Sequence, residues 1–106
     1  MVTEDIRQRL QMVVAELQSS AQQVASVSGQ IKELEGTLEH LSTQEDDRAV
    51  YRQSGPLLLE VSDRGKLSED IEKTITTLKE HEQRLVVQEE TLRTQYDQMV
   101  KQFEGS

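Results

Sequence analysis

Two long runs of seven-residue repeats constrain the fold of this chain more than any other feature. The first run spans about residues 3–46 and alternates apolar spacings of three and four over five heptads. Its two series are Leu10, Leu17, Val24, Ile31 and Leu38, and Ile6, Val13, Ser20, Val27, Leu34 and Leu41. The second run, about residues 66–104, has one series of Ile71, Leu78, Leu85, Leu92 and Met99, and another of Ile75, Glu82, Glu89, Tyr96 and Phe103. This pattern predicts two long helices that pack through one apolar seam.

A short connector lets the second helix run back along the first, and we predict one register for this antiparallel pair. The paired seam residues are Leu38 with Ile71, Leu34 with Ile75, Ile31 with Leu78, Val24 with Leu85, Leu17 with Leu92, and Ile6 with Phe103. This register sets Ser20 opposite Glu89, so one polar seam residue faces another. It also sets Val27 opposite Glu82, which is a poor pair. A register displaced by one helical turn stays open as the alternative.

The connector contains the stretch AVYRQSGPLLLEV, residues 49–61, which predicts a single β-hairpin. Strand-forming residues near 49–53 and 57–61 flank the turn signal Ser54-Gly55-Pro56. The unalternated leucines at 57–59 favour burial on both faces of the hairpin. An isolated two-stranded hairpin is marginal in water, and two helices do not cover both of its faces. We therefore predict one mainly α domain over residues 1–106, a long antiparallel two-helix coiled coil joined by a hairpin that needs partners from other chains.

Composition and charge exclude several function classes. The net charge is −8 and no cluster of lysine and arginine occurs, which argues against nucleic acid and anionic membrane surfaces as partners. No run of apolar residues approaches membrane-spanning length, the N-terminus does not resemble a signal peptide, and cysteine is absent. We expect a cytoplasmic protein.

No motif predicts catalysis, a metal or a cofactor. His40 and His81 are far apart in sequence, and both lie off the seam. Glu82 and Glu89 are one heptad apart on the seam, where carboxylates more often set the register of a coiled coil than act in acid–base chemistry. We predict that the chain is not an enzyme.

The open ends of the two helices carry more apolar side chains than a two-helix seam covers. Ile6, Leu10, Tyr96, Met99 and Phe103 are expected to stay partly exposed. Met12, Val14 and Val100 are further apolar residues that lie off the seam. Methionine and aromatic residues suit a surface that adapts to many partners. The alternative, that these residues only hold the helix ends together, remains open.

A long helix, a hairpin reading VYRQSGPLLLEV and a second long helix together resemble a β-class prefoldin subunit, most closely the archaeal ones. The shared pattern is a Val-Tyr-basic start at Val50, Tyr51 and Arg52, a glycine turn at Gly55, and an aliphatic strand at residues 57–59. A connector with room for one hairpin favours the β class, because α-class members carry two.

The resemblance implies a hexamer of two α and four β subunits, in which the hairpins join into a β-barrel body. The assembly residues would be Val50, Tyr51, Gly55, Leu57, Leu58, Leu59 and Val61. The coiled-coil tips would hold unfolded proteins without ATP or another cofactor and deliver them to a group II chaperonin. The client-binding residues would be Ile6, Leu10, Val14, Tyr96, Met99, Val100 and Phe103. Two other interpretations stay open: a coiled-coil scaffold or adaptor that docks a fixed partner through its hairpin, and a homodimeric four-helix bundle.

Overall fold

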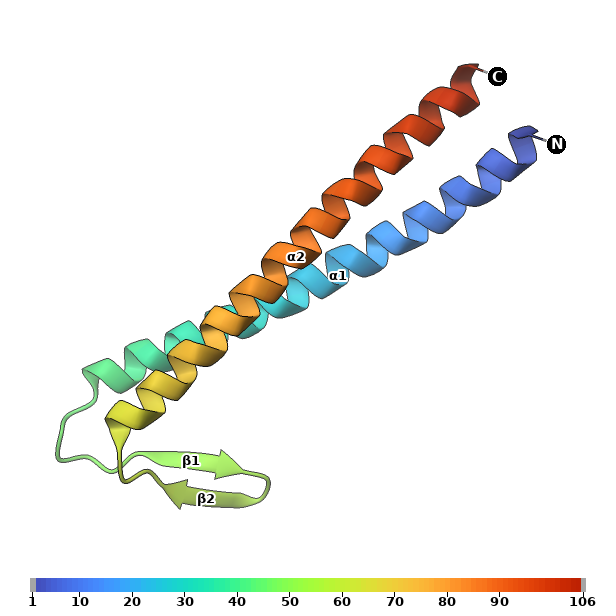
Figure 1. The fold of residues 1–106 in the computed structure, drawn as a ribbon. Helices are drawn as coiled ribbons and strands as arrows, with labels where there is room; N and C mark the ends of the chain where they lie inside the picture. The colour runs from blue at the N-terminus through green and yellow to red at the C-terminus, as the bar shows by residue number, and fades with distance from the viewer. Residues whose placement is uncertain (1, 106) are drawn as a thin grey trace. The chain divides into compact units, whose positions relative to one another are not determined.

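The chain folds into two long helices and a two-stranded antiparallel sheet (Figure 1). The computed structural model describes residues 2–105, and the side chains from residue 4 onward. The elements in order are α1 (Val2–Thr43), β1 (Tyr51–Ser54), β2 (Leu57–Glu60) and α2 (Arg64–Gly105). The predicted mainly α fold, with one hairpin between two long helices, is confirmed.

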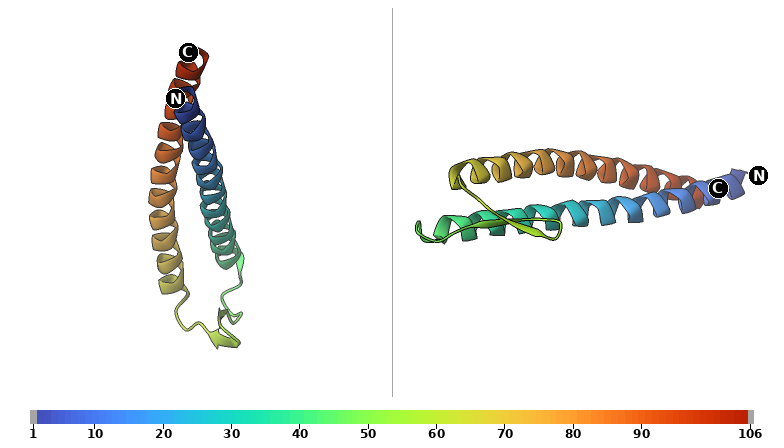
Figure 2. Two further views of the ribbon diagram at one scale, coloured as in Figure 1. Left: turned by 90° about the vertical axis from the view of Figure 1, so that its right-hand side faces the viewer. Right: turned by 90° about the horizontal axis from the view of Figure 1, so that it is seen from below.

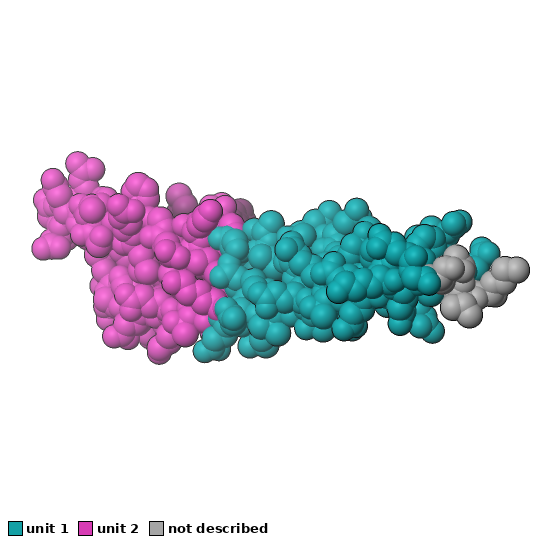
Figure 3. Space-filling model, turned by 90° about the horizontal axis from the view of Figure 1, so that it is seen from above, with its two compact units in different colours: residues 1–28, 80–106 teal, residues 29–79 magenta. Residues whose placement is uncertain are grey.

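The chain divides into two compact units, which are coloured separately in Figure 3. Unit 1 comprises residues 1–28 and 80–106, and unit 2 comprises residues 29–79. Within each unit, a segment of α1 runs antiparallel to a segment of α2 (Figure 2). Unit 2 also contains the hairpin.

Burial in both units follows the predicted heptads. In unit 1 the most buried side chains are those of Ile6, Val13, Ser20, Val27, Leu85 and Leu92. In unit 2 they are those of Ile31 and Ile75. All of these residues occupy predicted seam positions, and the other seam positions are half-buried. Apart from Ser20 these side chains are apolar, and removing them from water is the main contribution to helix pairing within each unit.

The end of α1 lies three residues before the predicted one at residue 46. The Ser42 hydroxyl donates a hydrogen bond to the Glu39 carbonyl at 2.7 Å, and the Thr43 hydroxyl donates one to the His40 carbonyl at 3.1 Å. Short hydroxyl side chains that bond back to carbonyls of the preceding turn in this way are common near helix ends. The chain then turns, with the Arg48 amide donating to the Glu45 carbonyl at 3.1 Å.

The start of α2 at Arg64 lies two residues before the predicted one, and Asp63 caps it. The Asp63 carboxylate accepts a hydrogen bond from the Lys66 amide at 3.0 Å, and its carbonyl accepts one from the Leu67 amide at 3.2 Å. A carboxylate at this position also interacts favourably with the helix dipole. The cap thus determines where the chain leaves the hairpin and becomes helical.

The hairpin closes through a two-residue turn. Ser54 pairs with Leu57, so Gly55 and Pro56 form the loop, and Gly55 has a φ of +58°. Glycine at the first loop position with positive φ is typical of a type II′ turn, whose twist matches that of the strands. The Val61 amide donates to the Val50 carbonyl at 2.7 Å and continues the ladder beyond the strands.

Candidate functional site

The hairpin presents its apolar side chains to solvent on both of its faces. Gln53 pairs with Leu58, and Arg52 pairs with Leu59, so these two leucines project from opposite faces. The exposed fractions are 60% for Leu57, 70% for Leu58, 51% for Leu59 and 59% for Tyr51. This chain therefore leaves a run of three leucines uncovered.

Two shallow hollows border the hairpin within unit 2. One is lined by Arg52, Leu59, Glu60, Val61, Ser62, Asp63, Lys66, Leu67 and Asp70. The other is lined by Thr37, His40, Leu41, Gln44, Ala49, Val50, Tyr51 and Leu67. Val50 and Val61 are half-buried in these hollows, whereas Leu57 and Leu58 line neither. We call the predicted assembly residues, Val50, Tyr51, Gly55, Leu57, Leu58, Leu59 and Val61, the hairpin surface.

The predicted client-binding residues all lie in unit 1, and we call them the helix-end residues: Ile6, Leu10, Val14, Tyr96, Met99, Val100 and Phe103. Ile6 is only 8% exposed, which differs from the expected partial exposure because the seam of the helix pair covers it. Val14 lies beside the seam and is 38% exposed. The other five helix-end residues are half-buried. Most of this set therefore keeps some apolar surface accessible.

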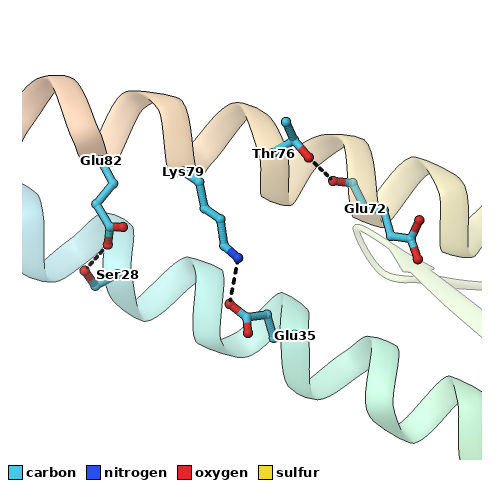
Figure 4. A network of polar contacts seen from close by, with 6 residues as sticks. All are labelled: Ser28, Glu35, Glu72, Thr76, Lys79 and Glu82. Atoms are coloured by element: carbon cyan, nitrogen blue, oxygen red, sulfur yellow. Dashed lines mark hydrogen bonds and ion pairs between the residues drawn. The ribbon is translucent and has the colours of Figure 1, made fainter.

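Two polar contacts across the helix pair bear on the predicted register (Figure 4). In unit 1 the Ser28 hydroxyl donates a part-buried hydrogen bond to Glu82, and Ser28 directly follows Val27, the residue predicted opposite Glu82. In unit 2 the Lys79 ammonium lies 3.9 Å from the Glu35 carboxylate. In the predicted register Glu35 lies opposite Thr74, so its contact with Lys79 is displaced by about one helical turn, in the direction of the alternative register.

The two polar seam residues predicted to lie opposite each other, Ser20 and Glu89, are not joined by a hydrogen bond. Glu89 accepts a hydrogen bond from the Arg93 guanidinium at 2.8 Å on its own helix, while the Ser20 hydroxyl is buried without a hydrogen-bond partner. The spacing of four residues between Glu89 and Arg93 was a signal for this ion pair. The bond from Ser28 to Glu82 had no comparable signal, because Ser28 lies beside the seam.

The histidines of the described part of the chain do not form a site with other polar groups. His40 and His81 are both exposed and belong to different units. Among residues 2–105, no group of three or more histidine, aspartate or glutamate side chains is placed to hold a metal ion. No helix in the same range has the length and apolar character needed to cross a membrane.

A family model described as "Prefoldin subunit" matches residues 4–104, which includes both helices and the hairpin. The chain belongs to the prefoldin subunit family. Prefoldin subunits are components of a chaperone and are not enzymes. Membership also implies assembly with other prefoldin subunits, and the exposed leucines of the hairpin surface suit such an assembly.

The fold is that of a prefoldin beta subunit. The crystal structure of the prefoldin beta subunit from Thermococcus strain KS-1 matches with a TM-score of 0.88 and 22% sequence identity. The match covers 97% of this chain and 90% of that one. Comparison with curated protein sequences gives no significant match. Because identity is low while the fold is shared, the two prefoldin chains have the same elements built largely from different side chains.

Proposed function

We propose that this chain is a β-class subunit of a hexameric prefoldin that acts as an ATP-independent holdase in the cytoplasm. Residues 1–106 act as one prefoldin-like domain in this proposal. The hairpin surface joins the subunits, and the helix-end residues hold unfolded proteins before delivery to a group II chaperonin. The observation that carries the proposal is the exposure of Leu57, Leu58 and Leu59 in a chain of the prefoldin family.

Assembly through the hairpin is supported by energetics. Covering an exposed leucine contributes on the order of 1–2 kcal/mol, and three consecutive leucines give a sizeable apolar contact. The outer edges of β1 and β2 also carry unpaired backbone groups, which neighbouring strands satisfy when they add to the sheet. The hairpins of two α and four β subunits, closing into one β-barrel body, would leave no free edges.

Client binding at the helix ends requires no nucleotide in this proposal. Each chain offers several half-buried apolar residues, so a single chain binds an unfolded segment weakly. Several chains on one body share a high effective concentration, and their weak contacts combine into stronger binding. Release then follows when a chaperonin competes for the same apolar segments.

The test of this proposal is the mass of the complex that forms with an α-class prefoldin subunit. We expect native mass spectrometry to detect one defined species with two α and four β chains. A chain that ignores the α-class subunit and remains alone would contradict the proposal and favour a coiled-coil scaffold. A discrete dimer of this chain alone, unchanged by the α-class subunit, would favour the four-helix bundle.

A further inference from the structure

The polar contacts of unit 1 identify which residues lie on the same side of the helix pair. Ser28 of α1 donates to Glu82, and Arg93 of α2 donates to Glu89. Glu82 and Glu89 are seven residues apart on α2 and therefore occupy equivalent positions on one face. Ser28 and Arg93 consequently lie on the same side of the seam.

An aliphatic strip extends along this side. Residues seven apart share a helix face, so Val14 and Ala21 lie in line with Ser28 on α1. Val86 and Val100 lie in line with Arg93 on α2 for the same reason. We call Val14, Ala21, Val86 and Val100 the apolar strip. Val14 and Ala21 are exposed, and the other two are half-buried.

The opposite side of unit 1 is polar. A shallow hollow on that side is lined by Glu16, Ser19, Ser20, Gln23, Gln88 and Leu92. Met12 is 63% exposed, but it does not belong to the strip. It lies two residues before Val14, and this spacing rotates its side chain by about 200° around α1, away from the strip. Accessible aliphatic surface beside the seam is thus concentrated on the side of the apolar strip.

The charges that border the strip are mainly acidic. On α2, Glu90 and Asp97 are exposed and follow Val86 and Arg93 by four residues, which makes them neighbours of the strip. Arg93 itself is paired with Glu89. On α1, Glu16 is the only charged residue between Leu10 and Ile31.

Two further charged residues lie at the end of the strip nearest the chain termini. Arg7 continues the row of Val14 on α1, and Glu104 follows Val100 by four residues on α2. These two side chains are opposite in charge and balance one another. The α2 border therefore keeps an acidic excess along the middle of the strip.

We propose that the apolar strip binds unfolded client segments that combine aliphatic side chains with lysine or arginine. The inference rests on the proposed holdase function and specifies its clients. Aliphatic client side chains cover the valines, while client cations lie against Glu90 and Asp97. Acidic segments of equal apolar content bind more weakly, because like charges then face each other.

The test is the binding of short fluorescent peptides to the full-length chain, followed by anisotropy. One peptide contains leucine and lysine, the second replaces each lysine with glutamate, and the third keeps lysine but replaces each leucine with serine. We expect the leucine–lysine peptide to bind about tenfold more tightly than either of the others, and added salt to reduce its advantage over the glutamate peptide. If the leucine–lysine peptide and the glutamate peptide bind equally tightly, the charge preference is wrong. If the serine peptide binds as tightly as the leucine–lysine peptide, the apolar contact is wrong.

Matched variants locate the surface. Val14→Ser combined with Val100→Ser should weaken the binding of the leucine–lysine peptide about tenfold. Met12→Ser changes a more exposed residue that lies off the strip, and it should leave this binding unchanged. Glu90→Gln combined with Asp97→Asn should remove most of the lysine preference. Glu16→Gln combined with Glu80→Gln makes the same charge change away from the strip and should preserve the preference. Circular dichroism confirms that each variant keeps its helices.

Client binding by the apolar strip and the holdase function can be contradicted independently of each other. If no peptide binds while the assembled protein still suppresses aggregation, the strip is overturned and the holdase function stands. If the peptides bind as expected and no aggregation is suppressed, the strip stands and the holdase function fails. Equal losses for Met12→Ser and the Val14 and Val100 variant would overturn the assignment to this side.

Discussion

At the residue scale, Ser20 is the clearest imperfection in the packing of unit 1. Its hydroxyl is buried without a hydrogen-bond partner, in a seam position that is otherwise aliphatic on α1. Leaving a buried hydroxyl unpaired costs free energy, because the group gives up water without gaining a partner.

We predict that Ser20→Ala raises the free energy of unfolding about 1 kcal/mol more than Ser26→Ala does. Both substitutions gain the same helix propensity, but Ser26 is exposed, so the difference isolates the buried hydroxyl. Urea unfolding followed by circular dichroism measures both. A smaller gain for Ser20→Ala than for Ser26→Ala would show that the hydroxyl finds a partner in solution.

Gly55 is the one described residue whose backbone requires glycine. Its φ is +58°, and a Cβ atom added there meets nothing within 4 Å, so the cost of substitution comes from the backbone alone. We predict that Gly55→Ala destabilises the hairpin by about 1–2 kcal/mol and lowers the melting temperature of the assembled complex. Gly29→Ala, also in open space but inside α1, should instead stabilise by about 1 kcal/mol. An unchanged complex with Gly55→Ala would contradict a role for this turn in assembly.

At the element scale, a substitution in the hairpin can be studied without changing the sequence of either helix. We predict that Leu58→Asp abolishes assembly with an α-class subunit. Leu58 is exposed in the single chain and would be covered by neighbouring subunits in the assembly, where an unpaired carboxylate costs free energy. The helical signal in circular dichroism should change little, since Leu58 lies outside both helices. Leu58→Val keeps an apolar strand residue and should assemble. Native mass spectrometry distinguishes the variants, and a hexamer formed with Leu58→Asp would contradict burial of this strand.

The elements were predictable from the sequence because two periodicities dominate it. The heptads predicted the seam, including the burial of Ile31 and Ile75, and the turn residues around Gly55 predicted a single hairpin. The exact helix ends were not predictable, because the Ser42 bond at the end of α1 and the Asp63 cap of α2 depend on local side-chain geometry.

The candidate site was predictable only in part. Exposure of the leucines followed from the absence of anything in the chain to cover them. The burial of Ile6 and the bond from Ser28 to Glu82 required the paired helices, because both depend on side chains distant in sequence. The heptad places Val14 in line with Ala21, but matching this row with the row of Val86 on α2 required the contacts of Ser28 and Arg93.

At the scale of the whole molecule, the proposed assembly surface and the proposed client-binding residues belong to different units of the chain. The hairpin surface lies in unit 2, and the helix-end residues lie in unit 1. Removal of residues 1–9 and 99–106 should therefore eliminate most aggregation suppression and leave the hexamer intact. Native mass spectrometry of the truncated complex provides the control. A truncated hexamer that protects clients as well as the full one would contradict client binding by the helix ends.

Light scattering from a chemically denatured protein diluted into buffer without ATP tests the holdase function of the assembled protein. We predict that this chain together with an α-class prefoldin subunit suppresses aggregation at near-stoichiometric ratios, and that this chain alone suppresses it much less. Several unrelated denatured proteins should be protected, because the contacts are apolar and adaptable. No suppression by a complex whose hexameric mass has been confirmed would contradict the holdase function.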